Sequence, residues 1–136
     1  MVNLNVNPSD ALKALILPEM DSGFVIYTNG SIPTTALPDE FIDIRPNGSL
    51  SSIASKRGVA EQVLAVSLYR KLLSTGATNT VRENILLGKF QSLFDNPLLS
   101  SEFSFHLDKS GIIYQGKNIE EGYSTRVLNV RVFINY

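Results

Sequence analysis

The segment Gly58–Asn79, GVAEQVLAVSLYRKLLSTGATN, decides the fold, because its apolar pattern suits two different secondary structures. Apolar residues recur at spacings of three and four positions, as at Val59 and Val63, and that spacing is typical of a helix. Alternate residues such as Leu64 and Val66 would also share one face of a buried strand. Residue propensities leave both possibilities open.

The centre of this segment, Val63–Tyr69, carries Val, Leu, Ala, Val, Ser, Leu and Tyr, and offers almost no polar face. An amphipathic helix normally leaves a polar face, whereas a strand covered on both sides gives a nearly continuous apolar run. If the whole of Ala60–Leu73 is one strand, it spans about 45 Å at about 3.3 Å per residue, more than a usual strand. Such a strand would bend, bulge or project from the core.

Length and composition exclude several classes of protein. The 136 residues fit a single domain over 1–136, and the absence of cysteine excludes a disulfide framework, a thiolate metal site and a thiol nucleophile. Twelve basic and 13 acidic residues give a net charge of -1, which is unlike the basic excess of a nucleic-acid-binding protein. The N-terminus has no signal-peptide pattern, and no apolar run approaches the roughly 20 residues that span a bilayer. We therefore expect a soluble protein made in a cytoplasm.

Two helices are predicted. Asn7 can cap the first, which carries a proline in its first turn and ends at Pro18. The second covers Thr80–Asn96, where Thr80 and Glu83 have the spacing of a capping box. Gly88 lies inside it at a propensity cost of about 1 kcal/mol and could let another backbone approach closely. The apolar residues expected to share one face of this helix are Val81, Ile85, Leu86, Phe90, Leu93 and Phe94.

Strands are predicted where β-forming or alternating residues end at turn signals. These are residues 23–28, 40–45, 102–107 and 123–136. Asp108–Gly111 is predicted to be a hairpin turn after the third of them, with the return strand starting at Ile112. Pro33 and Pro38 make the stretch before residue 40 unsuitable as a central strand, and residues 46–57 are expected to form a flexible loop or hairpin tip.

The resulting fold class is α+β. We expect a mainly antiparallel β-sheet, with the N-terminal helix and a second helix at about 80–95 packed on one face.

Residues with catalytic or metal-binding chemistry are sparse. His106 is the single histidine, it alternates with apolar residues, and it is interpreted as a solvent-facing strand residue. Asp39, Glu40 and Asp43 could together ligate a cation, but a solvated strand edge is the favoured interpretation. Glu120-Glu121 is interpreted as part of a solvated loop. No catalytic residue, cofactor site or metal site is therefore predicted.

Basic and aromatic residues were considered as binding groups. Lys56-Arg57 could touch phosphate, keep its loop soluble or contact a neighbouring protein. Tyr69, Tyr123, Phe133 and Tyr136 could stack on bases, but packing in a core or interface is favoured because little charge is clustered near them. What remains is a long strand and a long loop, and both suit a subunit that pairs with copies of itself.

The order of elements resembles the tail terminator, or tail completion, proteins of long-tailed bacteriophages. The most telling part runs from QVLAVSLYRK through GATN into a helix and closes on RVLNVRVFINY. The matching pieces are SDALKALIL, DEFIDIRPNG, AEQVLAVSLYRKLLSTGATN, VRENILLGKFQSLF and YSTRVLNVRVFINY. The Pro-rich stretch SIPTTALPDE has no counterpart that we can place in the family pattern.

The resemblance implies that Ala60–Leu73 is a strand. It also implies a structural virion protein that forms a ring, expected to be a hexamer, at the head-proximal end of the tail tube. Such a ring stops tube polymerisation and joins the tail to the neck. Its subunits would bind one another, the tube protein and a neck or connector protein. Neither membrane nor sequence-specific nucleic-acid binding is expected, and no enzymatic activity. The polar residues expected at its interfaces are Lys56, Arg57, Glu61, Arg70 and Arg126.

Two other functions remain open. The same pattern of elements could serve another head-tail connector component, such as a stopper or head-completion protein. A small ligand-binding or catalytic α+β domain would need a convergent polar pocket, for which His106, Asp39 and Asp43 are the candidates.

Overall fold

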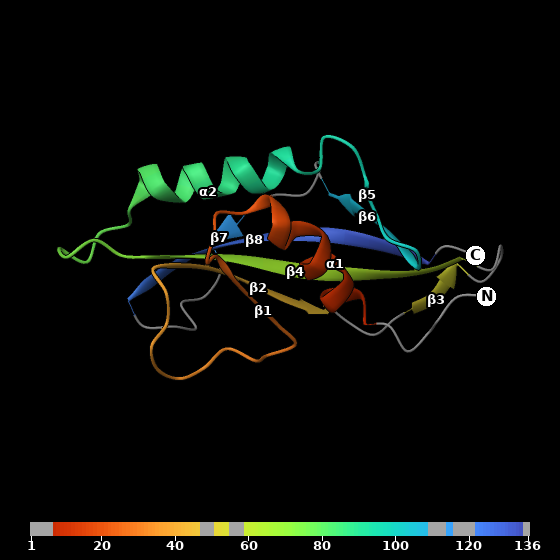
Figure 1. Ribbon diagram of the computed structural model, residues 1–136, viewed down its shortest axis with the longest axis horizontal. Helices are drawn as coiled ribbons and strands as arrows, with labels where there is room; N and C mark the ends of the chain where they lie inside the picture. The colour runs from red at the N-terminus through yellow and green to blue at the C-terminus, as the bar shows by residue number, and fades with distance from the viewer. Residues whose placement is uncertain (1–6, 47–50, 55–58, 109–113, 116–121, 135–136) are drawn as a thin grey trace.

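The computed structural model describes residues 7–46, 51–54, 59–108, 114–115 and 122–134. Two α-helices and a short 3₁₀-helix accompany a single curled sheet (Figure 1). The helices are α1 (Pro8–Ile16), η1 (Leu17–Glu19) and α2 (Thr80–Ser92). The strands are β1 (Val25–Thr28), β2 (Glu40–Pro46), β3 (Ser51–Ala54), β4 (Val59–Lys71), β5 (Leu98–Leu99), β6 (Phe103–Leu107), β7 (Tyr114–Gln115) and β8 (Tyr123–Ile134). The predicted α+β class is confirmed.

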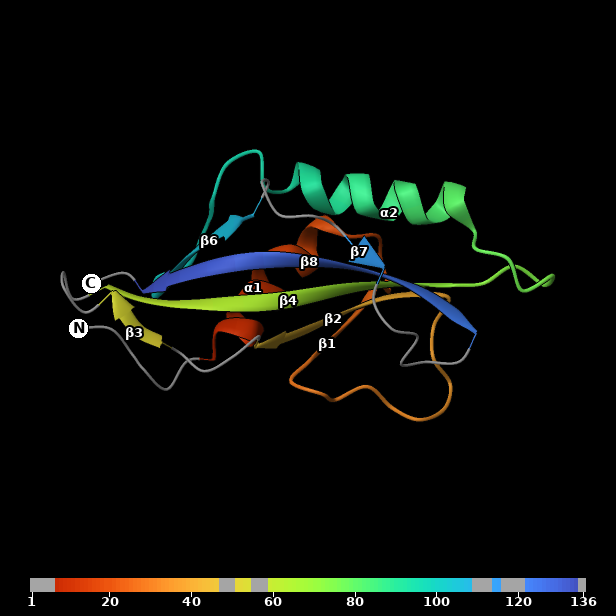
Figure 2. The same cartoon turned by 180° about the vertical axis from the view of Figure 1, so that it is seen from behind.

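The ambiguous segment is a strand. β4 pairs antiparallel with β8 from Glu61–Phe133 to Lys71–Tyr123, and the two strands run side by side along the molecule in both views (Figures 1 and 2). Its other edge pairs with β2 and then with β3. Because both edges are hydrogen-bonded to segments distant in sequence, the backbone of β4 is satisfied as a strand along its length. The prediction of a strand at roughly Ala60–Leu73 is confirmed, with the strand running from Val59 to Lys71.

The six main strands lie in the order β1-β2-β4-β8-β6-β5, with β3 added to β4 and β7 to β8. The pairs are antiparallel except β1 with β2, which run parallel. A parallel pair needs a long connection, and residues 29–39, which contain both Pro33 and Pro38, provide it. As predicted, this Pro-rich stretch is not a strand.

Both helices pack on the same face of the sheet. Leu12 and Ile16 of α1 and Leu86 and Phe90 of α2 are buried in one cluster. The strands contribute to this core Ile42, Ile44, Leu64, Val66, Leu68, Phe105, Leu128, Val130 and Val132, among others. α1 contacts β1, β2 and β6, although β4 and β8 lie between β2 and β6. One helix can reach both sides only because the sheet curls around it.

The other face of the sheet carries a second, smaller core. Phe41, Tyr69 and Tyr123 are buried there, with Ile32 and Leu37 of the 29–39 segment packed against them. The rings of Phe41 and Tyr69 stack with centroids 4.6 Å apart. Strand β4 is therefore covered on both faces at this end, which explains its continuous apolar run.

One local prediction was wrong. A hairpin at Asp108–Gly111 would make the following strand run back along β6. Instead, Leu107 pairs with Val130 and Tyr114 pairs with Val127, so β6 and β7 run in the same direction along β8. Both β6 and β7 hydrogen-bond to β8, and residues 109–113 between them lie outside the described residues.

Within the predicted loop of residues 46–57, the structure places β3 antiparallel to β4, with Ala54 opposite Val59. β3 and β4 therefore run in opposite directions, and residues 47–50 and 55–58 lie outside the described part of the chain. The flexibility of this segment stays a prediction. In the described ranges, no helix is long and apolar enough to cross a membrane.

Candidate functional site: the first turns of α2 and the sheet beneath them

Two of the predicted interface residues, Arg70 and Arg126, lie close together beneath α2. Arg70 is near the end of β4, and Arg126 lies on the adjacent strand β8. Glu61 pairs through its backbone with Phe133, toward the opposite end of the same two strands. Lys56 and Arg57 lie outside the described residues. Among the predicted interface residues that the structure describes, Arg70 and Arg126 form a cluster and Glu61 lies away from it.

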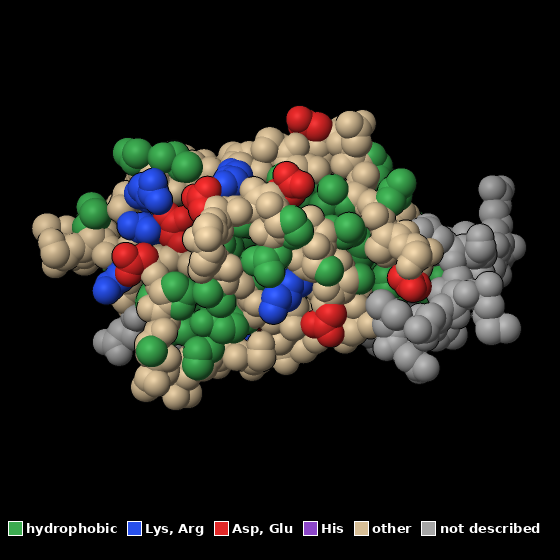
Figure 3. Space-filling model, in the orientation of Figure 1, with side chains coloured by type: hydrophobic (Ala, Val, Ile, Leu, Met, Phe, Trp, Pro, Cys, Tyr) green, Lys and Arg blue, Asp and Glu red, His purple; other side chains and the backbone are tan. Residues whose placement is uncertain are grey.

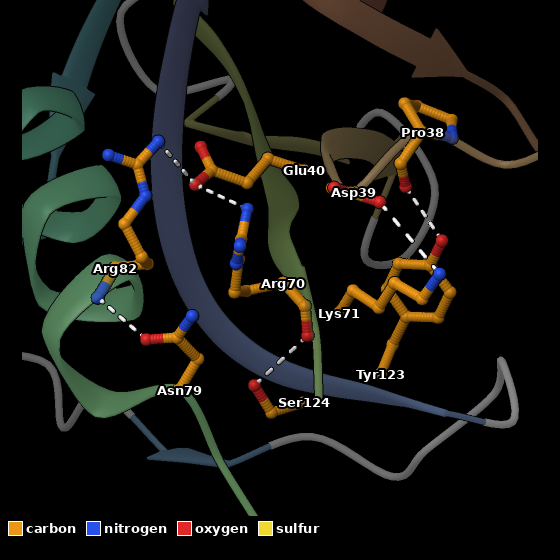
Figure 4. A network of polar contacts seen from close by, with 9 residues as sticks. All are labelled: Pro38, Asp39, Glu40, Arg70, Lys71, Asn79, Arg82, Tyr123 and Ser124. Atoms are coloured by element: carbon orange, nitrogen blue, oxygen red, sulfur yellow. Dashed lines mark hydrogen bonds and ion pairs between the residues drawn. The ribbon is translucent and has the colours of Figure 1, made fainter. Parts of the chain in front are cut away.

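Glu40 holds two guanidinium groups. Arg70 Nη1 donates to Glu40 Oε1 at 2.9 Å, and Arg82 Nη2 of α2 lies 3.2 Å from the same oxygen (Figure 4). The side chains of Arg70 and Glu40 are each 17% exposed, whereas that of Arg82 is 51% exposed. One carboxylate thus serves two cations, the inner one half-buried and the outer one in solvent, which leaves one positive charge in excess.

Glu83 is the most deeply buried charge in this cluster, at 3% exposure. Its Oε1 accepts a hydrogen bond from Arg126 Nε at 2.6 Å, and its Oε2 accepts one from the Ser124 hydroxyl at 2.5 Å. A buried carboxylate needs such partners, because burying an unpaired charge is costly. Glu83 therefore ties the first turns of α2 to β8 by polar contacts.

The predicted capping box at the start of α2 was wrong. The N-cap is Asn79, whose side-chain oxygen accepts a hydrogen bond from the Arg82 backbone N–H at 3.3 Å (Figure 4). Thr80 is the first helical residue, and the Glu83 side chain turns to the sheet instead of back to the cap. By contrast, Asn7 caps α1 as predicted, by accepting from Ser9 N at 2.8 Å.

The orientation of α2 also differs from the prediction. Val81 and Ile85 were expected on the buried face, but they are 70% and 53% exposed. The prediction is confirmed for Leu86 and Phe90, and for Phe94 just beyond the helix, which are buried; Glu83 joins them on the inward face. Because the pairing of Glu83 with Arg126 fixes the first turns, the apolar residues on the opposite side of the helix are turned to solvent.

An exposed surface results, which we call the α2 surface: Leu73, Val81, Arg82, Ile85 and Gly88. Leu73, in the connection after β4, is 46% exposed. A Cβ built at Gly88 would meet nothing within 4 Å, so Gly88 does not serve packing within this chain. In Figure 3, hydrophobic side chains gather over the start of α2, with Lys and Arg side chains beside them.

Below this cluster, the 29–39 segment is anchored to the end of the long strands. The Tyr123 hydroxyl donates to Pro38 O at 2.7 Å, and Lys71 Nζ lies 4.0 Å from Asp39 Oδ1 (Figure 4). Asp39 and Lys71 are largely exposed. The anchor therefore consists of the Tyr123 hydroxyl bond and of the Lys71 backbone N–H, which donates to Asp39 O at 2.8 Å.

The candidate residues for a ligand site do not converge. Asp39 pairs with Lys71; Glu40 faces the helices, and Asp43 lies on the opposite face of β2. His106 lies on β6, which is separated from β2 by β4 and β8, and its ring is edge-on to that of Phe133 with centroids 5.2 Å apart. These positions are too far apart for a hydrogen-bonded catalytic pair. Glu120 and Glu121 lie outside the described residues.

Asp43 is buried at 2% exposure, and its Oδ2 accepts from Arg45 Nε. Burial raises the pKa of Asp43, while the hydrogen bond and charge of Arg45 act in the opposite direction. In the described ranges, no three His, Asp or Glu side chains are grouped closely enough to hold a metal ion.

The aromatic candidates for base stacking are mostly packed within the protein. Tyr69 and Tyr123 are buried around Phe41. Phe133 is half-buried, with the guanidinium of Arg131 5.4 Å from its ring centroid. Tyr136 lies outside the described residues.

Neither protein-family models nor the curated proteins searched match this chain.

The features that sequence reasoning missed are the inward Glu83 and the outward Val81 and Ile85. A signal was present, since α2 has apolar residues on two opposite sides, at 81 and 85 and at 86 and 90. Such a helix can bury either side by periodicity alone.

Proposed function

We propose that this chain is a structural protein of a long-tailed bacteriophage, whose copies form a ring at the head-proximal end of the tail tube. In that position the ring occupies the last layer of the tube and so stops its polymerisation. Its other side provides the surface that joins the tail to the neck. The expected ring is a hexamer, and its partners are the tube protein and a neck or connector protein.

The observation that carries the proposal is the extended conformation of Val59–Lys71, paired along its length with Tyr123–Ile134. The resemblance to tail terminators requires a strand at this position, followed by a helix and a terminal strand group. The order found here is a helix, three strands, the long strand β4, a second helix and four further strands. An α-helix at 59–71 would have removed the basis of the resemblance.

A second feature supports assembly. The α2 surface leaves Val81 and Ile85 in solvent on a helix that already packs its other side on the sheet. Exposed apolar groups next to a charged rim are typical of protein–protein contacts. This is what a subunit completed by its neighbours requires.

The proposal is tested in the native particle by removing this chain from a phage that encodes it and imaging the products by negative stain. Overlong tails are expected for a terminator. Unstable filled heads with tails of normal length would instead assign the chain to the alternative, a stopper or head-completion protein. Particles with normal heads and tails would rule out both.

A purified system provides the second test. The chain is added to tube protein during polymerisation, and tube lengths are measured with an equal amount of an unrelated protein as control. A terminator shortens the length distribution in proportion to its concentration and labels one tube end. Unchanged tube lengths with no end labelling would contradict the proposal.

A further inference from the structure

The two ends of α2 carry surfaces of complementary character. At its start lies the α2 surface, in which Val81 and Ile85 are 70% and 53% exposed beside the guanidinium of Arg82. At its far end, the connection from α2 to β6 carries Leu99, 65% exposed, between Asp95 and Glu102. We call Asp95, Leu99 and Glu102 the β5 surface.

The charges of these two surfaces are opposite. Around the α2 surface, three cations (Arg70, Arg82 and Arg126) are paired with two carboxylates (Glu40 and Glu83). The excess positive charge belongs to the outermost cation, Arg82, because it shares Glu40 with the more buried Arg70. On the β5 surface, Asp95 and Glu102 form no ion pair with any described cation.

The geometry separates the two surfaces by the length of the helix. α2 has 13 residues, which corresponds to about 20 Å at 1.5 Å per residue. Figure 3 shows Lys and Arg side chains near the start of α2 and an Asp or Glu side chain over its far end. One copy therefore presents an apolar, positive end and an apolar, negative end.

We propose that the α2 surface binds the β5 surface of a second copy of this chain, head to tail. Val81 and Ile85 cover Leu99 of the neighbour, and Arg82 faces its Asp95 and Glu102. Docking two α2 surfaces against each other would instead bring two Arg82 side chains together, which is unfavourable. Gly88, with open space beside it, lets the neighbour approach the helix backbone. Repeated head-to-tail contacts close into a ring when the rotation permits.

This inference rests on the proposed function for its biological setting, but not for its physical basis. It names the surfaces through which copies meet, which the proposed function leaves open.

The test uses two variants of the full chain, each with one surface blocked. Val81→Ser combined with Ile85→Ser removes the apolar part of the α2 surface, and Leu99→Ser removes that of the β5 surface. Each variant alone is expected to be monomeric by sedimentation velocity, at concentrations where the wild type associates. In a mixture of the two variants, the intact β5 surface of one can bind the intact α2 surface of the other. The mixture is therefore expected to contain one-to-one dimers and no larger assemblies.

The matched control is Leu17→Ser, which removes an exposed apolar residue outside both surfaces and is expected to associate as the wild type does. All four substituted positions are exposed, and far-UV circular dichroism with urea midpoints checks that the variants are folded. A mixture that stays monomeric would overturn the inference, as would a Leu99→Ser variant that still self-associates or a wild type that is monomeric at every concentration tested.

Charge reversal gives an independent measurement. Asp95→Lys combined with Glu102→Lys is expected to raise the apparent Kd for association by about tenfold or more, and the wild type is expected to associate more weakly at high salt. Glu19→Lys, an exposed reversal on η1, is the control and should leave the Kd unchanged. A Kd that does not respond to the double reversal would contradict the proposed pairing.

The failures of the two proposals are distinguishable. If the blocked variants dimerise when mixed but tubes are neither capped nor lengthened by loss of the chain, the pairing holds and the proposed function is wrong. If tails become overlong on loss of the chain while the mixed variants stay monomeric, the function holds and the subunits meet elsewhere.

Discussion

Glu83 of α2 and Arg126 of β8 form a buried ion pair, with Oε1 and Nε 2.6 Å apart, and this contact sets the rotation of α2 on the sheet. Glu83 is almost fully enclosed, whereas the Arg126 side chain retains 33% exposure. The Ser124 hydroxyl donates to the second carboxylate oxygen. With its polar side fixed in this way, the first half of α2 has no freedom to turn Val81 and Ile85 inward.

Removing the carboxylate should therefore cost substantial stability. Glu83→Ala is expected to lower the free energy of unfolding by about 2–3 kcal/mol, because it leaves Ser124 and Arg126 without their charged acceptor. Equilibrium urea unfolding measures this, with Glu19→Ala as an exposed control expected within about 0.5 kcal/mol of the wild type. In a double-mutant cycle, adding Arg126→Met should cost less than it does alone. Additive losses would show that the two groups are not coupled.

The two sides of α2 should respond oppositely to truncation. Leu86→Ala and Phe90→Ala are expected to cost about 2–5 kcal/mol each, since both side chains fill the core under the helix. Val81→Ala and Ile85→Ala should change the free energy of unfolding by less than about 0.5 kcal/mol, because these side chains are exposed and alanine favours helices. Urea unfolding midpoints of the monomeric variants show which side of α2 is packed in the core. An Ile85→Ala loss as large as that of Leu86→Ala would mean that α2 is rotated.

Asp43 should make stability depend on pH. Because burial raises its pKa above the ordinary value of 3.8, the folded state binds the proton more tightly than the unfolded state. Its favourable contribution is present below the unfolded pKa and is lost as pH rises through the raised folded pKa. Asp43→Asn, which does not titrate, should therefore gain stability relative to the wild type as pH rises from about 3 toward 7.

Urea unfolding across that pH range measures the difference between the two proteins. Ser104→Ala, on the same side of the sheet as Asp43 and without a titratable group, serves as the control whose difference from the wild type should stay constant. A difference between Asp43→Asn and the wild type that is flat, or that falls with pH, would contradict the raised pKa.

Backbone strain in the 29–39 segment gives a fourth prediction. Ala36 has φ of 60°, in the left-handed region that costs a side chain about 1–2 kcal/mol relative to glycine. Ala36→Gly should therefore stabilise the protein by about 0.5–1 kcal/mol after the larger entropy of unfolded glycine is counted. Gly76, at φ 86°, is the reverse case, and Gly76→Ala should cost about 1–2 kcal/mol. Thermal unfolding would contradict this if both substitutions shifted Tm in the same direction.

The sequence by itself determined the elements whose signals are local. The cap at Asn7, the proline that follows it and the alternation of residues 123–134 place α1 and β8 where the structure has them. The prolines at 33 and 38 kept the 29–39 segment out of the sheet. These signals depend on propensity, capping and side-chain period, which act within a few residues and need no knowledge of distant partners.

The tertiary structure decided which of several locally acceptable arrangements is adopted. Val59–Lys71 is a strand because two distant segments, Glu40–Pro46 and Tyr123–Ile134, hydrogen-bond to its edges. One core buries its Leu64, Val66 and Leu68, and the core on the other face buries its Tyr69. α2 buries Leu86 instead of Ile85 because Glu83 accepts a hydrogen bond from Arg126 on β8. β7 runs along β8 in the same direction as β6 instead of returning antiparallel to β6. Each of these arrangements depends on contacts between residues far apart in the chain. The spacing of apolar residues along a helix or strand shows which side is apolar, but not which distant segment packs against that side.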